Sequence, residues 1–414
     1  MGEIQIKREK EISKVEEELQ NGVNISIINL IDCLLEKAHL MGASDIHIDP
    51  STNEVRVRMR IDGVLQDFYK FPKSIYSEVI SRIKVLARLR TDEHQATQDG
   101  RFRHLFKDND EFIDIRVSIV PTYHGENAVL RLLSDKAEGF NLDALGFSKS
   151  DQEKIMRAMK KTSGMILSTG PTGSGKTTTL YTLIKMLNSK DISIITIEDP
   201  IEYAIDGIEQ IQVNQHAGLT FANGLRSILR QDPNIIMVGE IRDSETANIA
   251  VNSALTGHLL LSTLHTNDSA TTLPRLLDMG IEPYLVASTV NIAIGQRLVR
   301  KICSHCKEKF AISPVIKESL SLSAVSPFLD QNFDLYKGKG CEKCNRSGYS
   351  GRLSINEVFV VTDEIREAIV RKASSSELRK IAVANGMKTM LQDGLDKVKD
   401  GKTTLEEILR VINE

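Results

Sequence analysis

The chain has no tryptophan, and only 5% of its 414 residues are aromatic. It also lacks any apolar run near the ~18–20 residues that a membrane-spanning helix requires. Its first residues, MGEIQIKREKEISK, alternate acids and bases where a secretion signal would have an apolar stretch. The sequence therefore indicates neither a membrane span nor export, and we expect a cytoplasmic protein.

The chain also has no large excess of positive or negative charge. The 53 Lys and Arg residues nearly balance 56 Asp and Glu residues, which gives a net charge of -3. This balance gives no global indication of nucleic-acid binding, although a local basic patch is compatible with it. Hydrophobic residues make up 41% of the chain and charged residues 26%, as in ordinary globular proteins. The length predicts two to four domains.

The first third of the chain predicts a small α+β domain. Residues 1–24 are rich in Glu and Lys and indicate a solvated helix or linker. Residues 25–134 begin with a helix that Ser26 is placed to cap, and the alternating EVRVRMRI then predicts a half-buried strand. Asp62 and Gly63 turn the chain into the next strand, and RFRHLF, FIDIRVSIV and NAVLRLL predict more. We therefore expect an antiparallel sheet here, followed by a linker over residues 135–145.

Beyond the linker the pattern changes to that of an α/β core. Apolar runs alternate with helical segments over residues 146–302, in the order MILSTG, ISIITIE, IEQIQV, NIIMVGE and HLLLSTLH. Continuous apolar runs are typical of strands buried on both faces of a parallel sheet. A cysteine-bearing module over residues 303–352 follows. A C-terminal helical subdomain is predicted over residues 353–414, with short helices from DEIREAIVRK to LEEILRVINE.

The first strand of this core leads into a phosphate-binding loop. The segment matches G-x-x-x-x-G-K-[ST] between a strand and a helix, the setting that this motif requires. Glycines let backbone N–H groups surround a phosphate, and the helix that follows turns its positive dipole end toward the anion. The motif is specific for a nucleoside triphosphate but fits a kinase as well as a hydrolase. The predicted nucleotide-binding residues are Gly170, Pro171, Thr172, Gly173, Ser174, Gly175, Lys176, Thr177 and Thr178.

Two later strands end in acids. ISIITIEDP ends in Glu198 and Asp199, and NIIMVGEIRD places Glu240 directly after Gly239. One strand-end carboxylate suits a magnesium ion and a second suits the attacking water of a hydrolase, although either acid alone also fits a solvated strand end. His265 ends a further strand, where it is placed either to sense the γ-phosphate or to satisfy a structural hydrogen bond.

The cysteines indicate a metal centre. Cys303 and Cys306 form one C-x-x-C pair, and Cys341 and Cys344 form another. In a reducing compartment this pattern predicts tetrahedral zinc with no open position, which is a structural site. His305 is then expected to be an exposed residue that does not bind the zinc. Redox chemistry is the weaker alternative, and flanking Lys and Arg leave nucleic-acid contact open, although stacking aromatics are few.

Taken together, GPTGSGKTTTLY, TIEDPIEY, LRQDPNIIMVGEIRD, TGHLLLSTLHTNDS and the cysteine pairs resemble the traffic ATPases of type II secretion and type IV pilus assembly. The resemblance runs in order from about Asn24 to the C-terminus. It implies a hexamer whose subunits join a PAS-like N-terminal domain to a RecA-like P-loop NTPase core. The zinc module favours the secretion and pilus-extension branch over the retraction branch.

The resemblance also implies residue roles. Glu240 matches the Walker B glutamate and would act with Thr177 on the Mg²⁺ side, while Glu198 would polarise the attacking water. His265 falls near the γ-phosphate. Arg116 and Arg131 match arginines that the N-terminal domain supplies to the nucleotide, although as isolated residues they also fit exposed strand positions. Three further residues match other arginines of that core, namely Arg226, Arg230 and Arg242.

The implied function is a bacterial motor that uses ATP, Mg²⁺ and Zn²⁺ and acts on an inner-membrane platform protein from the cytoplasmic side. No direct nucleic-acid partner is expected. Many members carry a further N-terminal docking domain, whereas only 24 residues precede the small domain here, so we expect either no such docking or a trimmed chain. The competing hypotheses are a RecA-like nucleic-acid translocase that uses the zinc module for contact, and a scaffold that does not hydrolyse ATP.

Overall fold

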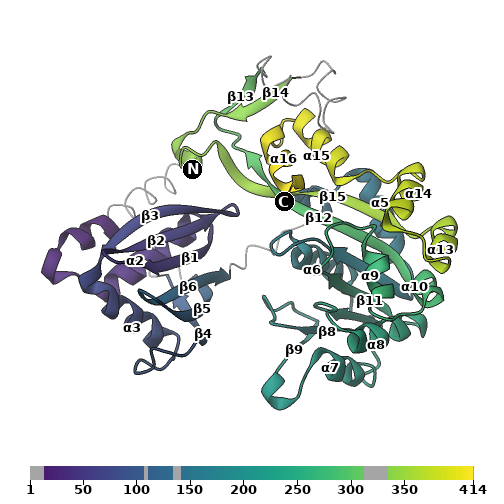
Figure 1. Cartoon of the computed structure of the whole chain (residues 1–414), viewed down its shortest axis with the longest axis horizontal. Coiled ribbons are helices and arrows are strands. Elements are labelled where there is room, and N and C mark those ends of the chain that lie inside the picture. Colours follow the sequence, from purple (N-terminus) through teal and green to yellow (C-terminus); the bar gives the residue numbers. More distant parts are fainter. Residues whose placement is uncertain (1–13, 107–110, 134–140, 312–333, 414) are drawn as a thin grey trace. The chain divides into compact units, whose positions relative to one another are not determined.

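A computed structural model describes residues 14–106, 111–133, 141–311 and 334–413 (Figure 1). The chain divides into two compact units, Met1–Glu138 and Gly139–Glu414. Parts of the predicted N-terminal segment, linker and cysteine module lie outside the described residues. Within the described part of the chain, no helix is both long and apolar enough to cross a membrane.

The first unit is a six-stranded antiparallel sheet in the order β3-β2-β1-β6-β5-β4. Helices α2 (Ile27–Leu40) and α3 (Tyr76–Leu86) pack with it, and short 3₁₀ helices η1 (Gly22–Asn24) and η2 (Lys73–Ile75) precede them. Ser26 caps α2 as predicted, since its hydroxyl accepts a hydrogen bond from the Asn29 N–H. The strands are β1 (Ala43–Pro50), β2 (Glu54–Ile61), β3 (Val64–Pro72), β4 (Gln98–Leu105), β5 (Phe112–Thr122) and β6 (Gly125–Leu133).

The core of this unit lies on one face of the sheet. The alternation predicted for β2 is confirmed, because Val55, Val57 and Met59 are at most 1% exposed while the arginines between them are not buried. Leu34 of α2 and Ile83 of α3 belong to the same apolar cluster. The opposite face of β5 and β6 carries the arginines considered below, together with the exposed apolar residues Phe112 and Val120.

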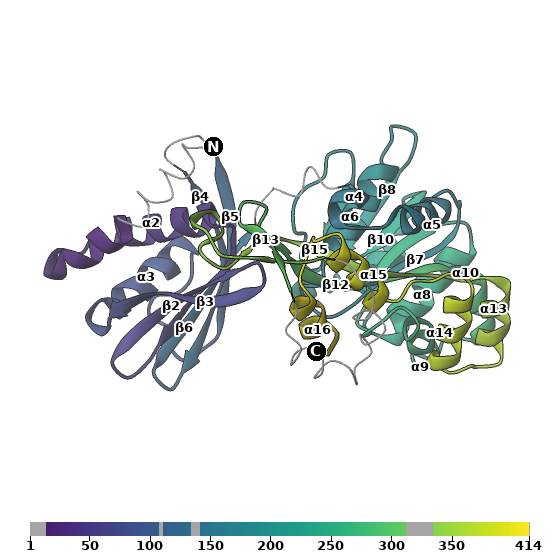
Figure 2. The same cartoon turned by 90° about the horizontal axis from the view of Figure 1, so that it is seen from above.

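The second unit contains a seven-stranded sheet in the order β15-β12-β7-β11-β10-β8-β9. Figure 2 labels five of its strands, β15, β12, β7, β10 and β8. All neighbours from β12 to β9 run parallel, and β15 pairs antiparallel with β12. Strands β13 and β14 pair antiparallel in a separate two-stranded sheet. The strands are β7 (Gly164–Thr169), β8 (Ile194–Glu198), β9 (Glu209–Gln212), β10 (Ile235–Val238), β11 (Leu259–Leu264), β12 (Val290–Ile302), β13 (Lys307–Phe310), β14 (Leu335–Gly338) and β15 (Tyr349–Val360).

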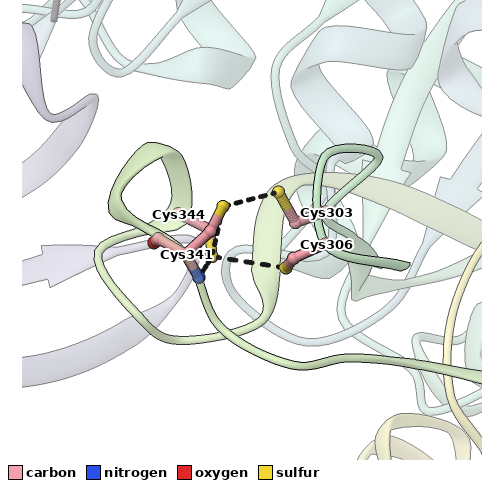
Figure 3. Close-up of side chains that lie close together, drawn as sticks. All are labelled: Cys303, Cys306, Cys341 and Cys344. Carbon is pink, nitrogen blue, oxygen red and sulfur yellow. Dashed lines mark hydrogen bonds between the residues drawn. The ribbon is translucent and has the colours of Figure 1, made fainter. Parts of the chain in front are cut away.

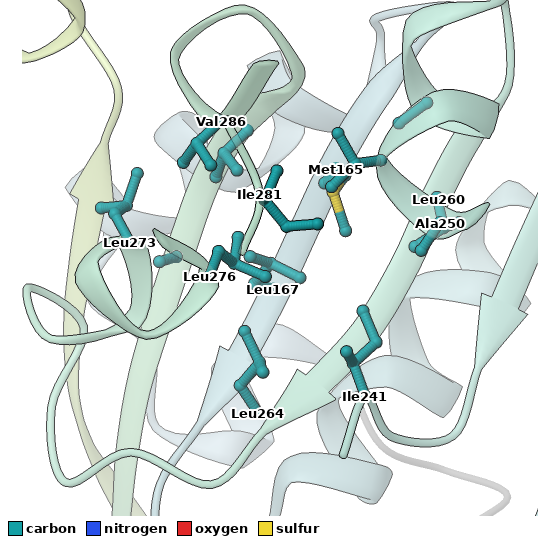
Figure 4. Packing of buried hydrophobic residues seen from close by; sticks show 14 of the residues in the cluster. Met165, Leu167, Ile241, Ala250, Leu260, Leu264, Leu273, Leu276, Ile281 and Val286 are labelled. Carbon is teal, nitrogen blue, oxygen red and sulfur yellow. The ribbon is translucent and has the colours of Figure 1, made fainter. Parts of the chain in front are cut away.

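Helices cover both faces of this sheet. Successive residues of a buried strand serve opposite layers, so that Met165 and Leu167 of β7 belong to one cluster and Ile166 to the other. Figure 4 shows the first cluster, where strand residues meet Leu276 of α9 and Val286 of α10. The helices are α4 (Leu142–Leu145), α5 (Lys149–Met159), α6 (Lys176–Leu187), α7 (Phe221–Ile228), α8 (Ser244–Leu255), α9 (Thr272–Asp278), α10 (Pro283–Thr289), α13 (Asp363–Val370), α14 (Ser375–Ala384), α15 (Met390–Lys399) and α16 (Leu405–Asn413), with 3₁₀ helices η4 (Gln215–Ala217) and η5 (Glu342–Cys344).

The C-terminal segment begins with a strand. The short helices expected from Asp363 onward correspond to α13 to α16, whereas residues 353–360 of the expected helical subdomain complete strand β15. The physical reason is the long partner strand β12, which offers a ladder from Ile292 to Ile302 to this apolar run. The sheet is therefore mixed rather than wholly parallel.

Helix α16 is attached to β12 by a buried carboxylate. Glu407 is 2% exposed and bonds the Arg300 guanidinium at 2.7 Å, the Arg300 backbone N–H at 3.0 Å and the Arg410 guanidinium at 2.9 Å. Burial by itself raises the pKa of Glu407, but the hydrogen bonds from Arg300 and Arg410 outweigh it and lower the pKa to about 2. The ionised carboxylate thus stabilises the docking of α16.

Candidate nucleotide site and metal centre

The loop between β7 and α6 depends on glycine. Gly170, Gly173 and Gly175 have φ of +144°, +77° and +93°, which side chains rarely tolerate. A Cβ on Gly170 would also lie 2.4 Å from the Gln296 carbonyl oxygen. The loop runs directly into the N-terminus of α6, so its backbone lies where a helix start favours an anion.

Side chains of this loop have the character of a phosphate site. Lys176 is buried, and its Nζ donates to the carbonyl oxygens of Gly170 at 2.8 Å and Pro171 at 2.9 Å. Burial lowers the pKa of Lys176, and the nearby Glu240 carboxylate opposes that shift. Ser174 is also buried, and its hydroxyl has no hydrogen-bond partner among the described residues. An unpaired buried hydroxyl beside a buried ammonium group fits an anionic ligand.

The strand order brings the predicted strand-end residues to the same edge as this loop. Strand β11 lies between β7 and β10, and β8 lies beyond β10, all running parallel. Their carboxyl ends therefore meet at one edge of the sheet. Glu198 ends β8, His265 follows β11 directly, and Glu240 lies two residues beyond β10.

Glu240 connects these neighbours. It is 9% exposed, and its Oε2 lies 2.9 Å from His265 Nε2. Its Oε1 lies 2.5 Å from the Arg242 guanidinium, and this hydrogen bond is the main cause that raises the pKa of Arg242. The structure therefore places His265 and Glu240 in contact, with Lys176 close enough to attract the same carboxylate.

Glu198 is held more deeply, at 3% exposure. One carboxylate oxygen accepts the Thr196 hydroxyl at 2.6 Å and the Gln210 amide at 3.1 Å. The other accepts the hydroxyl of Tyr181, which lies on α6. Burial raises the pKa of Tyr181, and the adjacent Glu198 carboxylate raises it further, so the phenol stays a donor. The carboxylate is thereby fixed in one orientation at the strand end.

This supporting network was missed in the sequence. The signals were weak: Thr196 is a lone hydroxyl in an apolar strand, and Tyr181 follows the loop lysine by five positions. Gln210 lies on the edge strand β9, and only the pairing of β8 with β9 brings it to Glu198.

The arginines divide between the two units. Arg226 binds Glu245 at 2.7 Å, and Arg230 donates to the Arg226 carbonyl oxygen at 3.0 Å, both in the second unit. Arg116 and Arg131 lie in the first unit, directly opposite each other on β5 and β6. Arg131 also contacts the buried Asp45 at 3.0 Å. Their contact with a nucleotide stays a prediction.

The four cysteines of the two pairs converge in the second unit (Figure 3). Sulfur–sulfur distances are 3.9 Å for Cys303 and Cys341, 3.8 Å for Cys306 and Cys344, and 3.7 Å for Cys341 and Cys344. A tetrahedral zinc with ~2.3 Å bonds to sulfur requires a separation of about 3.8 Å, so the spacing fits that metal. None of these cysteines forms a disulfide.

Backbone groups and the local fold support the cluster. Cys344 accepts the N–H groups of Cys341 at 3.2 Å and Gly348 at 3.3 Å. Burial raises the pKa of Cys344, but these N–H groups outweigh it and lower the pKa to about 7, which favours a thiolate ligand. Burial raises the pKa of Cys306 to about 12. His305 is exposed and faces Lys343 at 3.4 Å, as expected of a residue outside the ligand set.

Comparison with known proteins finds similarity to proteins of type II secretion and type IV pilus assembly. The family model described as type II/IV secretion system protein matches residues 21–410. Type II secretion system protein E of Xanthomonas campestris pv. campestris is 47% identical over 388 residues, covering 94% of this chain and 68% of that protein. The type IV pilus assembly ATPase PilB of Thermus thermophilus is 47% identical over 376 residues, covering 91% of this chain and 42% of that protein.

Solved structures agree in fold. The pilus retraction motor PilT with bound ADP is 26% identical, with a TM-score of 0.61 over 92% of this chain and 96% of that chain. The ATPase DotB of Legionella pneumophila has a TM-score of 0.67 over 92% of this chain and 95% of that chain. At 22% identity, DotB indicates the fold alone.

Proposed function

The chain belongs to the family of type II/IV secretion system proteins, and on this premise we propose that it is an ATP-hydrolysing hexameric motor for assembly of type IV pili or of a type II secretion pseudopilus. One observation carries the chemistry. The phosphate loop, Glu198, Glu240 and His265 share a single edge of the sheet. That arrangement can bind a triphosphate and direct water at its outer phosphate.

The first part of the mechanism is binding. The Nζ of Lys176 donates hydrogen bonds to two carbonyl oxygens of the loop, at 2.8 and 2.9 Å. A bound phosphate would offer this nitrogen charged acceptors, which form stronger hydrogen bonds. Thr177 and Glu240 would hold Mg²⁺, which would neutralise charge on the outer phosphates. The Ser174 hydroxyl would gain the partner that it lacks among the described residues.

The second part is hydrolysis. Glu198 would orient the attacking water and accept its proton, because three donors fix the carboxylate rather than leave it to rotate. His265 would contact the γ-phosphate while its other side remains bound to Glu240. Cleavage would remove the γ-phosphate contact and so change the restraint on the loop after β11.

The remaining roles concern the assembly. Arg116 and Arg131 would bring positive charge to the nucleotide from the first unit, as arginines do in phosphoryl transfer. To contact a nucleotide, Arg131 would either leave Asp45 or contact Asp45 and the nucleotide at the same time. The four cysteines would hold structural Zn²⁺. The partner would be an inner-membrane platform protein on the cytoplasmic side of a bacterial membrane.

The test is Mg²⁺-dependent ATP hydrolysis by the purified chain and by Lys176→Ala. We expect the variant to lose ATP binding and turnover, while Lys190→Ala, an exposed lysine at the end of the α6 segment, keeps both. Hydrolysis by Lys176→Ala at the parental rate would overturn the site assignment. Stimulation by DNA with a steep salt dependence would favour the nucleic-acid translocase instead.

A further inference from the structure

The segment that follows strand β11, residues 265–271, joins the nucleotide edge to helix α9. At its beginning, His265 contacts Glu240 at 2.9 Å, and the Thr266 N–H donates to the Thr169 hydroxyl at 3.1 Å. Thr169 is the last residue of β7, directly before the phosphate loop. The beginning of this segment therefore belongs to the nucleotide site.

The end of the same segment is held by a buried carboxylate from β15. Glu357 is 1% exposed, and one oxygen accepts both the N–H and the hydroxyl of Ser269, each at 2.7 Å. The other oxygen accepts the N–H of Met390, the first residue of α15, at 3.4 Å. Gly295 of β12, which pairs with Glu357 of β15, leaves the space: a Cβ there would lie 2.9 Å from Glu357 Cγ and 3.0 Å from the Ser269 nitrogen.

The middle of the segment is held by helix α14. Arg379 bonds Asp268 at 2.5 Å, with side chains that are 37% and 19% exposed. The other oxygen of Asp268 accepts the Thr271 N–H at 2.8 Å. The ion pair therefore acts on a carboxylate that already shapes the turn leading into α9.

We propose that the C-terminal helices α14 and α15 position His265 for hydrolysis, through Arg379 and Glu357 acting on residues 265–271. The inference rests on the proposed function and assigns to it two positioning residues, neither of which touches the nucleotide loop. His265 is itself 49% exposed, so its position depends on the backbone that carries it and on Glu240. Loss of Glu357 removes the acceptor of the N–H and hydroxyl of the buried Ser269, and loss of Arg379 removes the cation that holds the partly exposed Asp268 carboxylate. Either loss lets that backbone relax.

The first measurement separates catalysis from binding. For Arg379→Ala we expect kcat to fall roughly 3- to 30-fold with little change in the Kd for ATP, the range found when a coupling residue is lost. Glu357→Ala is expected to act in the same direction, and Arg379→Lys and Glu357→Gln should recover part of the rate because each keeps some of the contacts. The matched control is Arg371→Ala, which removes an ion pair between Arg371, directly after α13, and Glu377 of α14.

The second measurement is a double-mutant cycle on kcat between Arg379→Ala and His265→Ala. If Arg379 acts through His265, the second substitution adds little to the first. Parental kcat in both Arg379→Ala and Glu357→Ala, or full additivity in the cycle, would overturn this inference while leaving the motor assignment intact. If His265→Ala keeps the parental kcat, His265 has no role in hydrolysis and this inference fails. The ATPase assignment is tested separately, by the loss of hydrolysis in Lys176→Ala. If Glu357→Ala fails to fold, kcat can still be measured in Arg379→Ala, because Arg379 is partly exposed and its loss should not prevent folding.

Discussion

Removal of one cysteine sulfur gives a sharp test of the metal centre. In Cys344→Ser, the sulfur that lies 3.8 Å from Cys306 and 3.7 Å from Cys341 is lost. The neighbouring two-stranded sheet, β13 and β14, has strands of 4 residues each, too short for independent stability. Structural zinc contributes ~10–16 kcal/mol of apparent stabilisation in small zinc peptides, far more than two such short strands gain from their own ladder. We therefore expect about one zinc per parental chain and a large loss of zinc in the variant.

The assay is elemental analysis of the purified protein after dialysis, combined with limited proteolysis. Zinc loss should go together with new cleavage in residues 303–352, whereas the ATPase core should stay resistant. Cys33→Ser supplies the matched control, because Cys33 lies on α2 in the other unit and outside the four-sulfur cluster. Full zinc content in Cys344→Ser, or an equal loss in Cys33→Ser, would refute the assignment.

Three further outcomes are expected. Gly170→Ala should abolish ATP binding, measured with a fluorescent nucleotide, because a Cβ would lie 2.4 Å from a backbone carbonyl oxygen; parental affinity would contradict the loop geometry. Tyr181→Phe removes a donor from the buried Glu198 carboxylate, so kcat should fall ~10- to 100-fold, the kinetic equivalent of ~1.5–3 kcal/mol, while Tyr284→Phe at an exposed position of α10 serves as the control. Equal rates in both variants would count against the network. Since the pKa of Glu407 is lowered to about 2, its contribution is present above pH 4.5 and lost as the pH falls toward 2. Glu407→Gln should cost roughly 2–3 kcal/mol in urea unfolding at pH 7, with a smaller difference at pH 3, and a pH-independent difference would speak against the ion pair.

Local features of the chain were accessible from the sequence. The N-cap of α2, the alternation of β2 and the strand, loop and helix around Lys176 are each set by residues close together in the chain. The parallel strands β7, β8, β10 and β11 were also predicted, because a strand buried on both faces must be apolar throughout.

Features that depend on distant residues were not accessible. Residues 353–360 complete strand β15 because β12 offers them a ladder, and that partner strand lies far away in the sequence. Spacing along the chain does not reveal two of the contacts. Glu198 meets Gln210 because their strands are neighbours in the sheet, and Glu357 meets Ser269 although the two residues are 88 positions apart in the sequence. The sequence predicted the acids of the candidate site, whereas the residues that orient these acids could be found only from the fold.

The central claim is that strand-end acids act on a triphosphate held by the loop at residues 170–175. The most direct measurement compares ATP binding and hydrolysis in the parental chain and in Glu240→Gln, which keeps the shape of the side chain and removes its charge. We predict that the variant binds ATP but hydrolyses it at least ~10²-fold more slowly. Hydrolysis by Glu240→Gln at the parental rate would contradict the account.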